Sequence, residues 1–303
     1  MMASHEWQDE ELIELWHRCS NRNRWGSDDE LGTLNFITAE KRRAAAALVQ
    51  TGDVLSLAVD LSTEKSAKNA NPVVHMMTYE RHQPISALDF MGVSPHGFAV
   101  THLDAVGHVT WEGHAYNGRS AAEITTPSGM TFGSVYAQKR GIFTRGVLLD
   151  VAAAQGRDWL APDSYVTIDD LEAAEKLAGV EVGSGDAIFV RIGLEEREAA
   201  QGTEDITVRA GLHAECLEWL WEREVAVYSG DCVERMPYPS EVMPLPLHQV
   251  GLASIGLCLL DNPRVEELTA TCRSLGRSEF LLTVAPLALP GGTGSPVNPI
   301  AVF

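Results

Sequence analysis

A continuous apolar run at residues 187–192, Ala-Ile-Phe-Val-Arg-Ile, sets the first limit on what this chain can fold into. The run follows the turn-forming sequence Gly-Ser-Gly-Asp at residues 183–186. A short apolar run bounded by a turn predicts a strand, and a strand without polar alternation is covered on both faces. We therefore expect a sheet with other elements packed on each side of it.

Helical and strand patterns alternate along most of the chain. Thr167 and Asp170 have the spacing of a capping box, and Gly179 suits the end of the helix that they open. Further helices are predicted at residues 39–50, 212–223 and 265–275. Further strands are predicted at residues 54–59, 146–151, 225–228, 257–260 and 280–284. This alternation predicts an α/β fold with a substantial central sheet.

The charge balance narrows the range of partners. The 303 residues contain 23 Lys and Arg against 42 Asp and Glu, a formal net charge of −19, so most of the surface repels nucleic acid. No apolar stretch is long enough to cross a membrane, and the N-terminus does not resemble a secretory signal. Five widely spaced cysteines predict reduced, buried thiols rather than a disulfide framework. We expect a cytoplasmic protein whose partner is a small molecule.

The chemistry is concentrated in residues 95–118. His102, Asp104 and His108 are separated by even numbers of residues, and even spacing in an extended chain points side chains to one face. An imidazole and a carboxylate so placed can converge on one metal ion, and the small Ala105 and Gly107 let other groups approach. An isolated His-x-Asp pair is more often a simple hydrogen-bonded pair, and that alternative stays open.

The sequence excludes a zinc finger and argues against a Ser-His-Asp hydrolase. A zinc finger needs paired cysteines, and the chain has no Cys-x-x-Cys. A Ser-His-Asp hydrolase of the α/β-hydrolase type needs a Gly-x-Ser-x-Gly elbow, which is also absent.

The motif resembles that of the cyclase-like metal-dependent hydrolases, which include bacterial kynurenine formamidase and isatin hydrolase. Their hallmark is His-x-Gly-Thr-His-x-Asp-x-x-x-His, and residues 101–108 match its second half. Residues 146–151, 185–191, 245–248 and 294–297 resemble family landmarks in the family's order. The run at 24–35 resembles a longer branch, which implies a single domain over 1–303 with an N-terminal extension at about 1–36. The resemblance also implies a swivelling β/β/α-type fold with a central mixed sheet, and a homo-oligomer.

The resemblance assigns roles residue by residue. His102 and Asp104 match metal ligands, and His108 matches a histidine with a general acid/base role. His248, in Leu-Pro-Leu-His, matches a further ligand from far along the chain. Asp261 stands near an acidic family ligand, usually Glu, with an offset of one residue.

One position departs from the family pattern. Phe98 stands where the first histidine of the motif is expected, so one ligand is missing and a single ion is favoured over two. His96, two residues upstream, is the candidate that can replace it. Histidine and carboxylate ligands suit several divalent metals, and one Zn or Mn ion is expected.

Aromatic residues near the motif are candidate substrate contacts. Phe98, Trp111, Tyr116, His114 and Trp25 can supply the wall for a flat or aromatic substrate, although packing within the domain explains Trp111, Tyr116 and His114 equally well.

The expected activity is metal-dependent hydrolysis of a small aryl or cyclic amide, imide or ester through an activated water. Metal-dependent cyclisation of a polyketide-like carbonyl substrate is the alternative within the same family. A non-catalytic binding protein on the same fold is the third.

Overall fold

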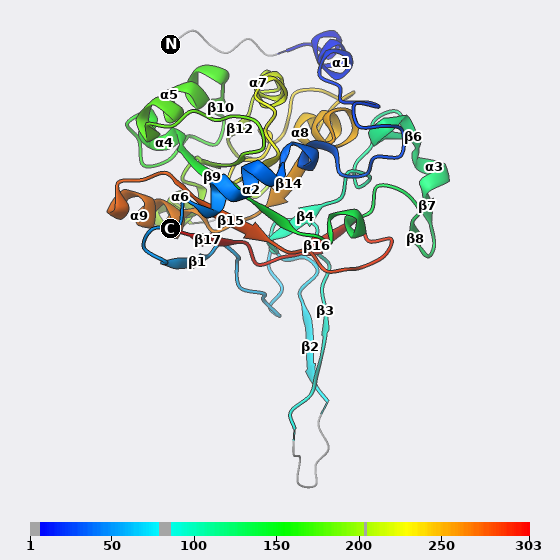
Figure 1. Ribbon diagram of the computed structural model, residues 1–303, viewed down its shortest axis with the longest axis horizontal. Coiled ribbons are helices and arrows are strands. Elements are labelled where there is room, and N and C mark those ends of the chain that lie inside the picture. The colour runs from blue at the N-terminus through cyan, green and yellow to red at the C-terminus, as the bar shows by residue number, and fades with distance from the viewer. Residues whose placement is uncertain (1–6, 79–85, 203–204) are drawn as a thin grey trace.

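A nine-stranded mixed sheet forms the centre of the molecule in the computed structural model, which describes residues 7–78, 86–202 and 205–303 (Figure 1). In spatial order its strands are β1 (Val54–Ser56), β17 (Ile300–Val302), β15 (Glu279–Val284), β9 (Ile142–Asp150), β11 (Ala187–Arg191), β13 (Val227–Gly230), β14 (Cys258–Asp261), β4 (His102–Asp104) and β16 (Gly294–Pro296). The strands β9, β11, β13 and β14 are parallel, and the outer ones pair antiparallel. The predicted α/β fold with a central mixed sheet is confirmed.

The strand β11 shows why the apolar run is continuous. Ile188 and Val190 belong to one hydrophobic core, whereas Ala187 and Phe189 belong to a second core on the opposite face. Every residue of β11 is buried, because successive side chains of a strand point to opposite faces and both faces are covered.

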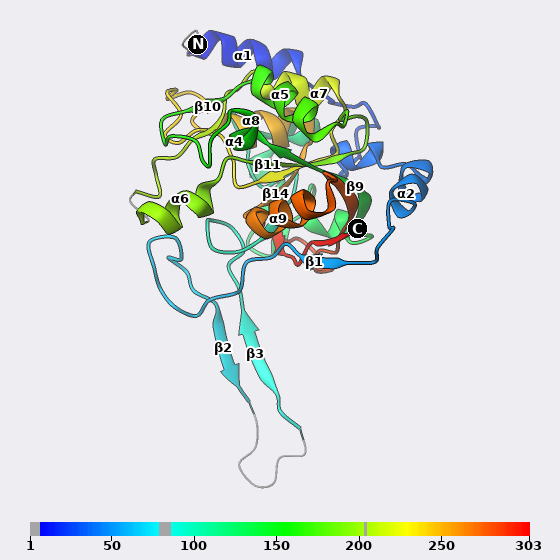
Figure 2. The ribbon, with the colours of Figure 1, turned by 90° about the vertical axis from the view of Figure 1, so that its left-hand side faces the viewer.

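Helices cover the two faces of the sheet. The first core includes residues from α1 (Asp9–Arg18), α5 (Ile168–Ala178), α7 (Cys216–Glu222) and α8 (Pro246–Val250), and the second includes residues from α9 (Val265–Leu275). Figure 2 shows α1, α5 and α7 on one side of the sheet and α9 on the other. The remaining helices are α2 (Ala39–Ala46), α3 (Ala121–Ile124), α4 (Val151–Ala154) and α6 (Leu194–Gln201). None of the described helices is long and apolar enough to span a membrane.

Local sequence signals explain several boundaries. The Thr167 hydroxyl and the Asp170 carboxylate form the predicted capping box of α5, and Gly179 ends the helix in the left-handed region. The helix α2 ends at Ala46, earlier than predicted, because the following N–H groups bond three residues back as the helix tightens into a turn. The predicted helix at 212–223 begins only at Cys216, because Leu212 pairs with Val166 in a short parallel ladder.

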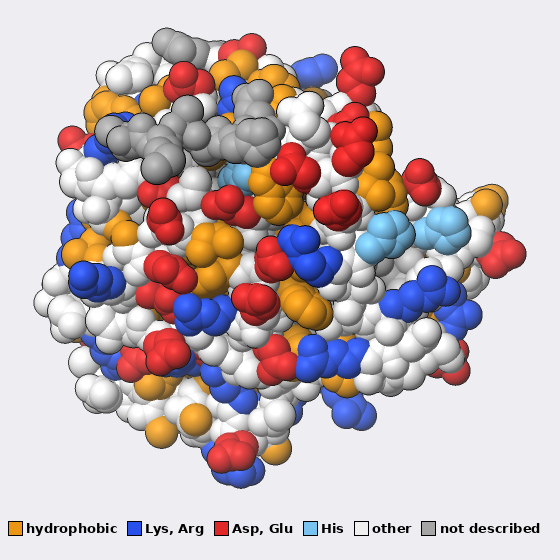
Figure 3. All heavy atoms as spheres, turned by 90° about the horizontal axis from the view of Figure 1, so that it is seen from above, with side chains coloured by type: hydrophobic (Ala, Val, Ile, Leu, Met, Phe, Trp, Pro, Cys, Tyr) orange, Lys and Arg blue, Asp and Glu red, His pale blue; other side chains and the backbone are white. Residues whose placement is uncertain are grey.

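A two-stranded ribbon projects from the body of the molecule. It is formed by β2 (Val74–Met77) and β3 (Asp89–Gly92), which lie antiparallel and extend away from the central sheet in both views (Figures 1 and 2). Figure 3 shows acidic side chains spread over one face of the body, with Lys and Arg side chains between them. All five cysteines lie buried as free thiols, as predicted. Of the predicted N-terminal extension, residues 1–6 lie outside the described residues.

Candidate metal centre

Two adjacent strands bring the central residues of the site together. The strands β4 and β14 pair antiparallel, and their register sets His102 directly opposite Asp261. Side chains opposite each other on adjacent strands lie about 5 Å apart at Cβ, so His102 and Asp261 share one face of the sheet. Asp104 is two residues beyond His102 on β4 and shares that face. The even spacing of His102 and Asp104 therefore has the structural meaning predicted for it.

His248 reaches the same place from α8, which begins with Pro246 at its first turn. Its Nε2 lies 3.4 Å from Oδ2 of Asp261 and 3.9 Å from Oδ2 of Asp104. The one-residue offset of Asp261 from the family pattern does not keep this carboxylate away from the cluster.

His96 completes the cluster from the loop before β4. Its Nδ1 lies 3.0 Å from Oδ1 of Asp104, and Nε2 of His102 lies 3.5 Å from the same oxygen. Phe98 lines the cavity described below, so the position that lacks a histidine still faces the site. His96 thus stands close enough to supply the ligand that Phe98 cannot.

Each of the three histidines has its other ring nitrogen bound outside the cluster. His102 donates from Nδ1 to the carbonyl of Val100 at 2.8 Å, and Nε2 of His96 lies 3.0 Å from the hydroxyl of Thr293. Nδ1 of His248 lies 3.0 Å from both carboxylate oxygens of Glu234. Outer partners of this kind fix the orientation and the tautomer of metal-binding histidines. The nitrogens that remain all face Asp104.

The donor atoms fit a divalent cation. Asp104 combines with His96 and His102 in one group of potential ligand atoms, and with His248 and Asp261 in another, with all atoms of each group within 4.8 Å of one another. Asp104 is 1% exposed, and neither of its carboxylate oxygens has a hydrogen-bond partner among the described residues. A buried carboxylate without hydrogen bonds is costly unless a positive charge lies beside it. Imidazole and carboxylate ligands suit Zn, Mn or Fe.

Burial and neighbouring charges act in opposite directions on the ionisable groups of the cluster. Burial disfavours the charged imidazole of His248, but the carboxylates of Glu234 and Asp261 outweigh burial and raise its pKa well above the ordinary value. Burial also opposes ionisation of Asp261, yet its hydrogen bond with His248 lowers the pKa of Asp261 to about 2. A cation that binds Nε2 of His248 has to displace a proton from that ring.

His108 lies beside the cluster without belonging to either ligand group. The chain turns after β4, with the His108 N–H donating to the carbonyl of Ala105, so this turn and not an extended chain brings the side chain in. The even spacing of His102, Asp104 and His108 predicted that an extended chain would place His108 beside the other two. His108 does lie there, but the turn is the reason. The His108 ring stacks on that of His96, with centroids 3.7 Å apart. Burial lowers the pKa of His108 to about 4, so the imidazole is neutral at physiological pH.

A cavity of about 190 Å³ opens onto the cluster. His96, His102, Asp104, His108, His248 and Asp261 all line it, together with apolar side chains from Phe98, Val109, Val233, Met236 and Leu245. Apolar walls with a few convergent polar groups are typical of small-molecule sites, but the usual lower size of such sites is roughly 300 Å³, so this cavity takes only part of such a ligand.

Four of the predicted substrate contacts lie elsewhere, and none is among the described residues that line this cavity. Trp111 packs against Trp16 and, with His114, borders a separate hollow beside α1. Tyr116 is fully buried, and its hydroxyl donates to Asp29. Trp25 packs against Phe36. His108 and Val109 are the last residues after β4 to line the cavity before the chain leaves it, which is why these aromatics do not follow the motif into the site.

Glu234 is the main site residue that the sequence did not reveal. Its side chain is 1% exposed and holds His248 by a charge-assisted hydrogen bond. Its only signal in the sequence is that an acidic residue stands a few positions beyond a buried strand, and no spacing rule links that residue to His248.

The Glu234→Gln variant is expected to bind its metal roughly 10- to 100-fold more weakly, because outer partners of metal-binding histidines have effects of that size. Titration of the metal-free protein with Zn or Mn measures the change. Glu241→Gln, at an exposed position, is the matched control. Equal affinity in Glu234→Gln and in the control would show that this carboxylate does not hold a ligand in place.

The fold and the cluster together define a class of protein: an α/β protein in which two adjacent strands of a mixed sheet, one helix and one loop bring together histidines and carboxylates of metal-binding type. The model of the family described as "Putative cyclase" matches residues 55–234. The chain belongs to this cyclase family, and the resemblance found in the sequence is confirmed.

Solved structures agree with this assignment. The crystal structure of a novel cyclase shares 30% sequence identity, with a TM-score of 0.83, and the match covers 94% of this chain and 99% of the other. An isatin hydrolase bound to the product analogue thioisatinate is 19% identical, with a TM-score of 0.60 and coverage of 88% and 99%. Isatin hydrolase A from Ralstonia solanacearum is 20% identical, with a TM-score of 0.58 and coverage of 88% and 98%. The last two show a shared fold. No curated protein matches the sequence.

Proposed function

We propose that this protein is a metal-dependent hydrolase of a small aryl or cyclic amide, imide or ester. The observation that carries the proposal is the convergence of three imidazoles and Asp261 on the buried carboxylate of Asp104, which makes no hydrogen bond with the described residues, with the neutral His108 beside them. The isatin hydrolases among the structural neighbours support hydrolysis as the reaction class.

The metal site and the substrate wall are formed by different residues. One divalent cation, Zn or Mn, would be held by His102, Asp104, His248, Asp261 and His96. Such a cation, when bound, polarises a carbonyl and makes a coordinated water more acidic. Phe98 and its apolar neighbours supply a dry wall for the ring of the substrate.

His108 moves the proton. Because its imidazole is neutral, it first accepts a proton from the attacking water and acts as the base. It then returns that proton to the nitrogen or oxygen that leaves as the C–N or C–O bond breaks. The ring of His96, stacked on that of His108, limits rotation of the imidazole.

Two measurements test this function. Metal analysis of protein purified without chelator is expected to give about one ion per chain, and a screen of metal-loaded protein over formyl-anilides, cyclic imides, lactams and lactones is expected to find turnover. A chain without metal would instead support a binding protein.

Cyclisation is the second candidate, because the matched family is described as a cyclase. The reaction run in ¹⁸O-labelled water separates the two. Hydrolysis places the label in the product, whereas ring closure without water addition does not.

We also propose that the protein is a homo-oligomer, in which a second copy covers the β2–β3 ribbon. A lone two-stranded ribbon is only marginally stable in water. Both faces of the ribbon also expose apolar side chains, which belong to Val74, Met76, Met77, Phe90 and Met91. Light scattering is expected to give a multiple of 32.9 kDa, and a monomer at micromolar concentration contradicts the proposal.

A further inference from the structure

A second chamber of about 350 Å³ adjoins the metal-site cavity. Phe98, Val233 and Asn262 line both spaces, so a molecule in the chamber lies next to the metal centre. The lower size limit for sites that hold small ligands is roughly 300 Å³, so the chamber has room for one. Much of its wall is apolar, with side chains from Val59, Ala99, Leu194, Pro263 and Val265.

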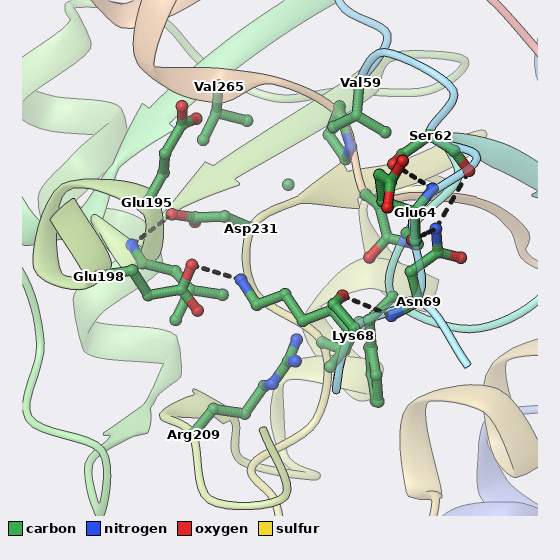
Figure 4. Close-up of a pocket in the computed structure, with 18 residues that line it drawn as sticks. Val59, Ser62, Glu64, Lys68, Asn69, Glu195, Glu198, Arg209, Asp231 and Val265 are labelled. Atoms are coloured by element: carbon green, nitrogen blue, oxygen red, sulfur yellow. Dashed lines mark hydrogen bonds and ion pairs between the residues drawn. The ribbon is translucent and has the colours of Figure 1, made fainter. Parts of the chain in front are cut away.

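Arg209 places a positive charge in this chamber. Its side chain points from its loop toward the middle of the space (Figure 4), and the guanidinium lies over the ring of Phe98, 4.2 Å from the ring centroid. The residue is only 6% exposed. An arginine keeps its charge even when buried, so it requires a hydrogen-bonding or ionic partner.

That partner is not found among the described residues. The guanidinium makes one long hydrogen bond, from Nη2 to the carbonyl of Ile206 at 3.4 Å, and its Nε has no partner. The described residues provide no carboxylate within ion-pairing distance of Arg209. Apart from this hydrogen bond and the Phe98 ring, no described group is in contact with the guanidinium to compensate its buried charge, which is costly in a folded protein.

Four described acidic residues line the chamber with Arg209; two of them, Glu198 and Asp231, are engaged by other groups, and the other two, Glu64 and Glu195, form no ion pair with it. Glu198 pairs with Lys68, the other cation of the chamber wall. Asp231 accepts hydrogen bonds from the N–H groups of Ile192 and Leu194, each at 2.7 Å. Of the two cationic side chains in the described wall, Arg209 is thus the one that remains available to a ligand.

The backbone fixes the position of Arg209 relative to the metal centre. Its N–H donates to the carbonyl of Met236, and the N–H of Met236 donates back, each at 3.0 Å. Met236 lines the metal-site cavity, and Glu234, which holds His248, is two residues away. Gly211 makes this close approach possible, because a Cβ there would lie 2.3 Å from the backbone of Glu234.

We infer that Arg209 binds the carboxylate of an apolar organic acid whose body fills the chamber. Arginine offers planar, paired N–H donors that match a carboxylate, and its bond to this group is charge-assisted. This inference rests on the proposed function in one respect: the same molecule is the substrate, with its reactive carbonyl in the metal-site cavity. The substrate class is then a carboxylate-bearing aryl or cyclic amide, imide or ester.

Binding of phenylacetate, compared with its neutral analogue phenylacetamide, tests the inference without any measurement of activity. Calorimetry on the metal-loaded protein is expected to show phenylacetate binding at least roughly 10-fold more tightly than phenylacetamide. Arg209→Met is expected to weaken phenylacetate roughly 10- to 100-fold, and Arg209→Lys to restore part of the loss, because lysine keeps the charge but not the planar pair of donors. Arg157→Met, at an exposed position, serves as the control.

Other outcomes overturn the inference. If phenylacetate binds Arg209→Met as it binds the wild type and is lost when the metal is removed, the carboxylate binds the metal instead. If phenylacetamide binds the wild type as tightly as phenylacetate does, the chamber does not recognise the negative charge. This comparison requires only the wild-type protein. A protein that binds phenylacetate through Arg209 but turns over no substrate would refute the proposed hydrolysis and leave the anion site intact.

Discussion

The Asp104→Asn variant is expected to lose its bound metal and to fall in turnover by roughly 10³ or more. Asp104 belongs to both groups of potential ligands, so replacing its carboxylate with an amide weakens both at once. A bound metal ion contributes several kcal/mol of transition-state stabilisation, and each 1.36 kcal/mol corresponds to about tenfold in rate. Metal content per chain and turnover measure the two losses.

The same substitution is not expected to unfold the protein. Asn has nearly the shape of Asp, and the carboxylate oxygens of Asp104 make no hydrogen bond with the described residues that the change could break. Metal at 100 times its dissociation constant should stabilise the wild type by about 2.7 kcal/mol, and Asp104→Asn should lose that gain. Asp158→Asn, at an exposed position, should keep it. Full metal content in Asp104→Asn would remove this residue from the ligand set.

The His108→Ala variant is expected to keep its metal and lose roughly 10²- to 10⁴-fold in kcat, the usual contribution of a general base. His108 lies outside both ligand groups, so its removal separates proton transfer from metal binding. His17→Ala, at an exposed position in the last turn of α1, is the control. Loss of metal in His108→Ala would mean that His108 is a ligand rather than the base.

The pH profile gives a second test of His108. Burial lowers its pKa to about 4, and a bound cation adds positive charge that lowers it further. The imidazole is therefore neutral, and able to act as a base, at any pH above about 4. His108 should therefore cause no change in kcat/KM between pH 6 and 8. The fall in kcat/KM that its protonation causes should come only as the pH approaches 4. A decline centred near pH 6.5 that disappears in His108→Ala would contradict the buried, neutral imidazole.

Spacing predicted part of this site, for a clear physical reason. His102 and Asp104 lie on one short strand, where a two-residue separation guarantees a shared face. His248 and Asp261 come from another helix and strand, and only the resemblance to a family connected them to the motif. The register of β4 against β14, which brings Asp261 into place, is a long-range pairing that the local sequence does not encode.

The spacing of residues in the sequence does not reveal the other parts of the site. Glu234 and Arg209 are single charged residues in irregular segments, and their roles become visible only through burial and partners. Trp111 and Tyr116 follow the motif closely in sequence, yet the turn after β4 sends them into packing contacts beside the N-terminal segment. In the same way, the central strands were predictable from apolar runs, whereas the short strands β16 and β17 were not.

The pairing of His102 with Asp261 across β4 and β14 also connects parts of the chain that are far apart in sequence. A cation held by both strands acts as a removable cross-link that closes a long loop and is absent from the unfolded chain. A ligand that binds only the folded state shifts the folding equilibrium, and shifts of about 1–2 kcal/mol change the abundance of a protein in the cell several-fold. The supply of the metal would then set how much of this protein escapes degradation, in addition to how fast each copy works.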